Sequence, residues 1–483
     1  MKASTNKLDR AIEPGAQEAL DLFQEAARRV PAYKDFLSKA RINPEKVRTT
    51  NDFAVVPPVD KANYLTKYPL AELCWDGVLF GSEMISVSSG STGDPFFWPR
   101  GDSQDEEGAW MHEQFFTKVF RAHKKSTLVV VCFSMGTWIA GSFTTSSAIR
   151  LARKDYPINV VTPGIEKEEA LKAIRNLSSQ YEQVLLAGYP PFVKDILDAG
   201  SFYGIDWEQL QMRFLFAGEN FGEDWRDHVL EVGGSGNPYY DSLSVYGTAD
   251  AAILGNETPV SIAVRRLFNE NPALLEQHFG TQVLPSLMQY YPDRRYFESV
   301  GGELVFTARA GIPLIRYNIH DTGGLFSFNE ILTPIIEQFT DVAATNKIDP
   351  TEWRLPFVFI HGRKDFTTTL YAVLIYPENI KAALLDERVR NLVTGKFTMS
   401  TKYYSDMDQY LEVNVELAQG RVSKPGEVDL ITKILIEELT TLNAEYKKLR
   451  ASVGVKATPQ VQLIEYGNKD YFGPGAKHRW KRQ

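Results

Sequence analysis

The chain has 483 residues, of which 43% are hydrophobic and 24% are charged. These proportions are ordinary for a globular protein and exclude a largely disordered chain. At about 150 residues per domain, the length allows about three folded units, or one large domain and a smaller one. The formal charge of −8 is spread along the chain, so we expect no general electrostatic binding of nucleic acid.

The two cysteines, Cys74 and Cys132, are too few for a disulfide framework or a multi-cysteine zinc site, which favours a reducing, cytoplasmic setting. The polar N-terminus lacks the apolar core of a signal peptide. Residues 126–149 carry no charge and are numerous enough to span a bilayer, but nine of these 24 residues are Ser or Thr. We therefore expect a buried strand, a loop and the start of a helix there, and no membrane span.

In chain order, the first 80 residues are expected to be mainly helical. Ala16–Val30 has apolar residues at helical spacing, and Pro31 ends this helix. A short apolar run at Ser82–Ser88 leads into a loop of Gly, Ser and Thr. Short apolar strands then alternate with amphipathic helices: strands 129–133, 158–162, 184–188 and 213–217, and helices 141–153, 167–179, 191–199 and 223–232. This alternation predicts an α/β fold with a mostly parallel sheet covered by helices on both faces.

After Asp241 the pattern changes to short β-like runs at 242–246, 302–307 and 314–317, which suggest a second sheet or a small barrel. Beyond Gly362 we expect a strand at 411–417, one long helix at 428–449 and a final strand at 461–465. This tail of about 120 residues has the length of a separate α+β domain.

The strongest local motif is the loop Ser88-Ser89-Gly90-Ser91-Thr92-Gly93-Asp94-Pro95. Its small residues let backbone N–H groups approach a polyphosphate, and its hydroxyl groups add donors. It lacks the Gly-Lys pair of the common P-loop, so by itself it could equally be a surface turn.

Further short motifs follow in order. Residues 215–220 end a strand with a turn suited to a flat base, and 245–250 put an aromatic ring and a carboxylate on one loop. Residues 315–323 end a strand with a carboxylate, as contact with a ribose diol requires, and 361–365 open the tail. Each motif alone is weak, so the order and spacing of the set carry the interpretation.

With these motifs in this order, the chain resembles the adenylate-forming superfamily, and within it the phenylacetate–CoA ligase-like family. Residues 30–34 and 57–68 are similar to the opening of that family, and 88–95 to its SSGTTGKP loop. Residues 136–141 stand where the family has a glycine-rich pocket segment. Residues 246–250 resemble YGxxE, 315–321 resemble IRYRTRD, and 362–380 match the family's hinge segment without a gap.

The resemblance implies a large N-terminal adenylation domain (1–361) with mostly parallel sheets and a small β-rich subdomain, followed by a smaller, mobile α+β C-terminal domain (362–483). It implies an enzyme that uses Mg²⁺ and ATP to convert a small or aromatic carboxylic acid into an acyl-adenylate. A thiol, usually that of coenzyme A, then displaces AMP. We expect a monomer or homodimer with no nucleic-acid or membrane partner.

The resemblance also implies roles for particular residues. The β- and γ-phosphates would lie on the loop, the adenine beside the second motif with the ring of the third stacked on it, and the ribose on the fourth and fifth motifs. The residues assigned in this way are Ser88, Ser89, Gly90, Ser91, Thr92 and Gly93 for the phosphates, Gly218, Glu219, Tyr246 and Gly247 for the adenine, Thr248 for the α-phosphate, Asp250 for Mg²⁺, Asp321 and Arg363 for the ribose, and Asp365 for the hinge.

The family's catalytic lysine lies near the C-terminus, where Lys477 is the best candidate and Lys481 the reserve. Phe133, Trp138 and Tyr189 fall where the family shapes its acyl pocket. If they are not ordinary core aromatics, they favour a flat or aromatic acid.

Departures from the family keep alternatives open. Asp94 replaces the usual lysine of the phosphate loop, and Thr367–Thr369 with Ala372 alter the segment that lines the thiol entry. One alternative is an adenylating enzyme whose acceptor is an amine, a carrier protein or another nucleophile. The other is a catalytically weakened homologue that binds nucleotide, which Asp94 and Asp250, the latter in place of the Glu of YGxxE, keep open.

Overall fold

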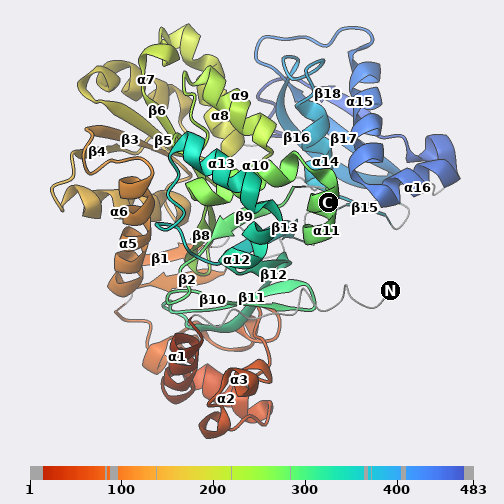
Figure 1. Cartoon of the computed structure of the whole chain (residues 1–483). Helices are drawn as coiled ribbons and strands as arrows, with labels where there is room; N and C mark the ends of the chain where they lie inside the picture. Colours follow the sequence, from red (N-terminus) through yellow and green to blue (C-terminus); the bar gives the residue numbers. More distant parts are fainter. Residues whose placement is uncertain are drawn as a thin grey trace.

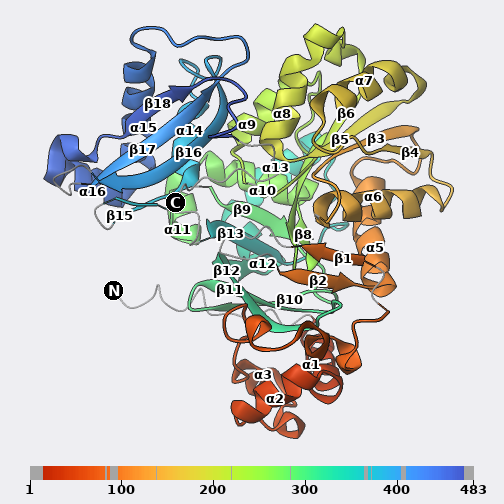
Figure 2. The same cartoon turned by 180° about the vertical axis from the view of Figure 1, so that it is seen from behind.

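The computed structural model describes residues 15–81, 84–87, 96–137, 139–218, 220–282, 284–363, 368–370, 373–403 and 409–472. Helices of the N-terminal part lie at one end of the molecule, a large α/β body forms its middle, and the C-terminal part packs beside that body (Figure 1). Seen from behind, the same three regions remain separate in space (Figure 2).

The N-terminal part is helical, as expected. Its helices are α1 (Ala16–Arg29), α2 (Pro31–Lys39), α3 (Thr50–Ala54) and α4 (Leu70–Leu73). The apolar face of α1 is buried, and α2 begins at Pro31, where the missing N–H is tolerated in the first turn of a helix. Arg316 fastens this part to the sheet, since it donates hydrogen bonds to the carbonyls of Ala54 and Val56 and pairs with Glu298.

The largest sheet in the described part has 11 strands in the order β10-β11-β12-β13-β9-β8-β7-β6-β5-β3-β4. The five strands from β7 to β4 in that order are parallel. The strand bounds are β3 Thr127–Cys132, β4 Ile158–Val161, β5 Gln183–Gly188, β6 Met212–Ala217, β7 Ser242–Thr248, β8 Ala252–Asn256, β9 Ser286–Gln289, β10 Tyr296–Val300, β11 Glu303–Ala308, β12 Leu314–Phe326 and β13 Phe357–Arg363.

Helices cover both faces of the parallel strands, which confirms the predicted α/β architecture. Along β3, Val129 and Val131 enter one hydrophobic core, whereas Leu128 and Val130 enter the other. Such an all-apolar strand is typical of a sheet that is buried on both sides. The helices of this body are α5 Asp102–Lys118, α6 Ile139–Ala152, α7 Lys167–Leu177, α8 Pro190–Ala199, α9 Glu223–Val232, α10 Pro259–Asn269, α11 Pro272–Phe279, α12 Phe328–Leu332 and α13 Ile336–Asn346.

The β-like runs after Asp241 do not form a sheet or barrel of their own. β7 turns back antiparallel onto β8, and β9 then joins β8 to β13, so the β-rich part extends the same sheet. β12 is 13 residues long, far beyond the predicted run at 314–317. The second half of β12 contains polar residues, so the apolar pattern did not predict that the strand continues. Alternation identifies a half-buried strand, but it does not identify the strands with which it pairs.

The C-terminal lobe comprises the described residues from 368 to 472 and has a hydrophobic core of its own. Its elements are β14 Thr368–Leu370, β15 Val373–Ile375, α14 Pro377–Leu384, β16 Val393–Tyr403, β17 Gln409–Leu417, α15 Glu427–Leu442, α16 Ala444–Val453 and β18 Gln460–Ile464. The prediction of one long helix at 428–449 is wrong, because Asn443 interrupts it: its side chain accepts a hydrogen bond from the backbone N–H of Tyr446 and caps a second helix. The predicted domain boundary at residue 362 stays a prediction.

The uncharged stretch 126–149 contributes β3 and the first part of α6. Among the helices that the structure describes, none combines the length and the apolar character needed to cross a membrane.

Candidate active site

The candidate site lies where the parallel strands end. β3, β5, β6 and β7 are neighbours and parallel, so the residues that follow or end them meet at one edge of the sheet. Phe133 follows β3, Tyr189 follows β5, Gly218 follows β6, and Tyr246 lies near the end of β7. In open α/β sheets, this carboxyl edge is the usual place for a ligand. Four residues that the sequence assigned to the site are therefore brought to one edge.

Gly218 lies against the ring of Tyr189. Its φ is +91°, a backbone conformation that residues other than glycine rarely adopt, and a Cβ atom added there would lie 3.4 Å from Tyr189 Cδ2. Glycine thus lets the backbone after β6 turn sharply beside an aromatic ring. This is the geometry expected of a wall that accepts a flat group.

Two tyrosine–aspartate hydrogen bonds join the β7–β8 region to β12. Tyr246 Oη donates to Asp321 Oδ2 at 2.5 Å, and Tyr317 Oη donates to Asp250 Oδ2 at 2.6 Å. Both carboxylates are buried, with 4% of Asp321 and 7% of Asp250 exposed. Asp250 and Asp321, which are 71 positions apart in the sequence, are thereby each fixed by a phenol. Tyr317 was missed as a site residue, although it lies within the motif that drew attention to Asp321.

Asp321 and Arg363 are direct partners in the β12–β13 ladder. The sequence assigned this pair to the ribose, and the register brings their backbones side by side. Thr322 Oγ1 adds a side-chain hydrogen bond between the same two strands, since it donates to the carbonyl of Gly362 at 3.0 Å.

Thr248 and Gly247 shape the turn that carries Asp250. The Thr248 hydroxyl accepts a hydrogen bond from the backbone N–H of Ala251 at 3.0 Å. A Cβ atom at Gly247 would lie 3.2 Å from the carbonyl oxygen of Ala252, so the two strands approach closely there. Thr248 therefore holds the turn that presents Asp250. Among the described residues, no group of three His, Cys, Asp or Glu side chains is arranged to hold a metal ion.

The phosphate loop, residues 88–95, lies outside the described residues, but its two ends do not. β1 (Met84–Val87) and β2 (Phe97–Arg100) pair antiparallel, with Val87 opposite Phe97. The backbone N–H of Val87 donates to the carbonyl of Thr137 at 2.9 Å, in the segment that follows β3. The loop therefore starts and ends close to the carboxyl edge of the sheet, and β1 and β2 lie beside α5 in both views (Figure 2).

The predicted site residues that fall outside the described residues, those of the loop included, are Ser88, Ser89, Gly90, Ser91, Thr92, Gly93, Glu219, Trp138, Asp365, Lys477 and Lys481. Of the predicted acyl-pocket residues that are described, Phe133 is buried in the core beneath α5 and α6, and Tyr189 is 7% exposed.

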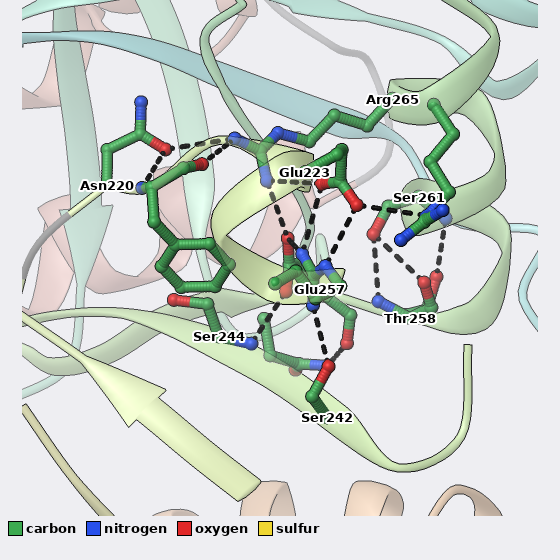
Figure 3. Close-up of polar contacts among 12 residues, drawn as sticks. Asn220, Glu223, Ser242, Ser244, Glu257, Thr258, Ser261 and Arg265 are labelled. Atoms are coloured by element: carbon green, nitrogen blue, oxygen red, sulfur yellow. Dashed lines mark hydrogen bonds and ion pairs between the residues drawn. The ribbon is translucent and has the colours of Figure 1, made fainter. Parts of the chain in front are cut away.

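Sequence reasoning missed a buried cluster of charges next to the site. Arg226 and Arg265 both bind Glu223 and Glu257, with nitrogen–oxygen distances of 2.6 to 3.4 Å, and Arg266 also contacts Glu223 (Figure 3). Burial opposes ionisation of Glu223, but the three guanidinium groups outweigh it and hold the pKa of Glu223 below its usual value. The members come from α9, α10 and the segment between β8 and α10, so no sequence spacing reveals the cluster.

Arg265 links this cluster to the turn after β6. Its Nη2 donates to Asn220 Oδ1 at 3.2 Å and also to the carbonyl oxygen of Phe221. Figure 3 shows the guanidinium of Arg265 between Asn220 on one side and Glu223 and Glu257 on the other. We name the described residues of this turn, Gly218, Asn220 and Phe221, the β6–α9 turn.

A scan against models of known protein families finds no match, and a search of the curated proteins finds none either. Solved structures match along nearly the whole chain. A 2-hydroxyisobutyryl-CoA ligase in the postadenylation state, bound to an acyl-AMP, has a TM-score of 0.65 at 15% identity and covers 94% of this chain and 86% of its own. The acyl acid amido synthetase AtGH3.15 in complex with 2,4-DB has a TM-score of 0.57 at 12% identity, with coverage of 94% and 88%.

The same 2-hydroxyisobutyryl-CoA ligase in its thioesterification state matches with a TM-score of 0.53 at 16% identity, covering 94% of this chain and 87% of its own. The chain therefore has the fold of adenylate-forming ligases.

Proposed function

We propose that the protein is an AMP-forming ligase that activates a carboxylic acid with ATP and Mg²⁺. A carboxylate oxygen attacks the α-phosphorus, the bond to the bridging oxygen breaks, and pyrophosphate leaves, which gives an acyl-adenylate. A thiol, in our proposal that of coenzyme A, then attacks the acyl carbon and releases AMP. The observation that supports this most is the pair of buried carboxylates, Asp250 and Asp321, held by tyrosines at the carboxyl edge of an adenylate-forming fold.

Within this proposal, Asp321 accepts hydrogen bonds from the ribose hydroxyls and Arg363 donates to them, and Tyr246 packs on the adenine beside Gly218. Asp250 offers the hard carboxylate oxygen that Mg²⁺ prefers. The ion would neutralise charge on the phosphates as pyrophosphate leaves. The buried Tyr317 hydroxyl keeps the Asp250 carboxylate in place.

The acid and the acceptor are the finer parts of the proposal. We propose a phenylacetate–CoA ligase-like enzyme that takes a small or aromatic acid, because Tyr189, which the resemblance assigns to the acyl pocket, presents an aromatic ring at the carboxyl edge of the sheet. Coenzyme A as acceptor is supported by the bound coenzyme A in another structure of the ligase named above. An amine acceptor is the second candidate, because an acyl acid amido synthetase has the same fold.

Pyrophosphate exchange with a panel of small and aromatic carboxylic acids tests the proposal. An acid-dependent exchange of label into ATP is expected for at least one acid. Product analysis with coenzyme A or with amines then identifies the acceptor. If no acid in the panel supports exchange while ATP still binds, the protein is a weakened nucleotide-binding homologue, an alternative that Asp94 in the phosphate loop keeps open.

Nucleotide binding should stabilise the folded chain. A ligand that binds only the folded state, at 100 times its Kd, adds about 2.7 kcal/mol to the free energy of unfolding. We expect ATP with Mg²⁺, and AMP alone, to raise the melting temperature through the same pocket, with CMP at the same concentration as the control. A melting temperature that none of ATP, AMP and an adenylate analogue changes would contradict the proposed site.

The variants Asp321→Ala and Arg363→Ala should each weaken nucleotide binding without unfolding the protein. Loss of one charge-assisted hydrogen bond to the ribose costs about 1.5–3 kcal/mol, or about 10- to 100-fold in Kd. Calorimetric titration with ATP measures this loss.

His320→Asn is the matched control for these two variants. His320 is next to Asp321 in the chain but contacts Glu303 instead, and asparagine tolerates its positive φ of 64°. Unchanged ATP affinity in both test variants would move the ribose elsewhere.

A further inference from the structure

The C-terminal lobe is joined to the large body by polar contacts of two kinds. Away from the candidate site, Lys396 of β16 pairs with Asp195 of α8 at 2.5 Å, and Lys167 of α7 donates to Tyr466 Oη at 2.6 Å. At the candidate site, Lys381 of α14 donates from Nζ to the backbone carbonyl of Asn220 at 3.2 Å. Both views show this lobe beside α8 and α9 (Figures 1 and 2). Lys381 thus reaches from the C-terminal lobe to the β6–α9 turn.

Asn220 is held from two directions. From the large body, Arg265 donates to its side-chain oxygen, and the same oxygen accepts from the backbone N–H of Phe221 at 2.9 Å. From the C-terminal lobe, Lys381 Nζ donates a hydrogen bond to the main-chain carbonyl of Asn220. The first set of contacts is internal to the body and survives any movement of the lobe. The second exists only while the lobe lies where it does here.

The surroundings of Lys381 disfavour the charged form of its side chain. Burial lowers the pKa of Lys381 well below its usual value, since the interface disfavours the charged ammonium. Lys433 of the same lobe differs in exposure, since 70% of its side chain is accessible. A hydrogen bond from the Lys381 nitrogen to a main-chain carbonyl is also stronger in a low-dielectric interface than in water.

We propose that Lys381 is a positioning residue for adenylation, which it supports by fixing the β6–α9 turn while the lobe is in the arrangement seen here. The proposal rests on the proposed function, in which this turn borders the nucleotide. The whole chain matches the postadenylation structure of the ligase with a TM-score of 0.65 and its thioesterification structure with one of 0.53, so we assign the contact to the first half-reaction. Once the lobe moves, the Asn220 carbonyl loses this donor, whereas the contacts of Arg265 and of the Phe221 N–H with the Asn220 side-chain oxygen remain.

The test compares Lys381→Met with Lys381→Arg in the full chain. Methionine keeps the apolar stem and removes the donor, whereas arginine keeps a cationic donor. We expect Lys381→Met to slow acid-dependent pyrophosphate exchange about 2- to 10-fold, the equivalent of one intramolecular hydrogen bond, with a higher KM for ATP. Attack of coenzyme A on preformed acyl-adenylate should keep its rate. Lys381→Arg should recover part of the exchange activity.

Hydrogen–deuterium exchange provides a readout that does not need activity. In Lys381→Met, the peptide that contains Asn220 and Phe221 should exchange about tenfold faster than in the original protein. Lys433→Met is the matched control, because it removes an exposed lysine of the same lobe, and both readouts should stay unchanged in it.

The outcomes separate this inference from the proposed function. If the unaltered protein supports no exchange with any acid, the proposed function fails, and the deuterium readout still decides whether Lys381 holds the turn. Unchanged deuterium exchange in Lys381→Met overturns the inference. So does an equal loss in both half-reactions with a lowered melting temperature, because a residue that merely holds the fold together would give that result.

Discussion

Replacing Lys477 by alanine is expected to slow adenylate formation by a factor of about 10²–10³ while ATP affinity stays near normal. Attack on the α-phosphate builds negative charge on the phosphate oxygens, and the carboxylate of the acid repels that centre. A positioned ammonium offsets both effects more in the transition state than in the ground state, so it acts on rate more than on binding. Loss of one such electrostatic donor costs about 2.7–4 kcal/mol in the barrier. Single-turnover pyrophosphate release at saturating ATP measures the loss.

Lys481→Ala is the matched control, four residues further along the same basic terminus, and should behave like the unaltered protein. Conversion of preformed acyl-adenylate should be largely spared in Lys477→Ala. If Lys481→Ala is the inactive variant and Lys477→Ala the active one, the assignment of the lysine is displaced by four residues. If both variants remain active, no terminal lysine mechanism operates in this chain.

Glu257→Ala should lower the free energy of unfolding by about 3–5 kcal/mol, the usual cost of removing one partner from a buried ion pair. Glu257 is 1% exposed, accepts from Arg226 at 2.6 Å, and also accepts the backbone N–H of Ser244 at 2.7 Å. Without it, Glu223 is, among the described residues, the one carboxylate that both Arg226 and Arg265 contact. Urea unfolding, followed by fluorescence, measures the change.

Glu437→Ala is the control of the same chemistry. Glu437 is 43% exposed and pairs with Arg388 at the surface, where ion pairs contribute about 0–1 kcal/mol. A loss for Glu257→Ala no larger than for Glu437→Ala would mean that water or a rearranged side chain compensates the buried arginines. In that case the cluster would not stabilise the region beside the β6–α9 turn.

Much of the α/β body could be predicted from the sequence, because each of its elements has a burial pattern in its own residues. The helix Ala16–Arg29 carries its apolar residues on one face, and β3, β5 and β6 are short apolar runs between amphipathic helices. Strand ends are also local features. Gly218 and Tyr246 could therefore be named as candidate site residues, since parallel strands present their carboxyl ends at one edge.

The pairing of distant residues could not be predicted in this way. The donors for the two candidate carboxylates are Tyr317 of β12 for Asp250 and Tyr246 of β7 for Asp321. β13, β9 and β8 lie between these two strands in the sheet, so no local pattern could pair the residues. β12 continues to Phe326, well beyond the apolar run that predicted it, because backbone hydrogen bonds to β13 stabilise its second half.

By itself, then, the sequence determined the order of strands and helices, the covered parallel sheet and the motif residues at strand ends, since all of these depend on neighbours within a few positions. Only the tertiary structure decided which charges become buried together. Glu223, Glu257 and Arg265 stand on separate segments with no shared periodicity. They are compensated because Arg226 of α9 and Arg265 of α10 both reach Glu257, which follows β8. A buried charge is tolerated only where folding brings an opposite charge to it, and that depends on packing rather than on spacing along the chain.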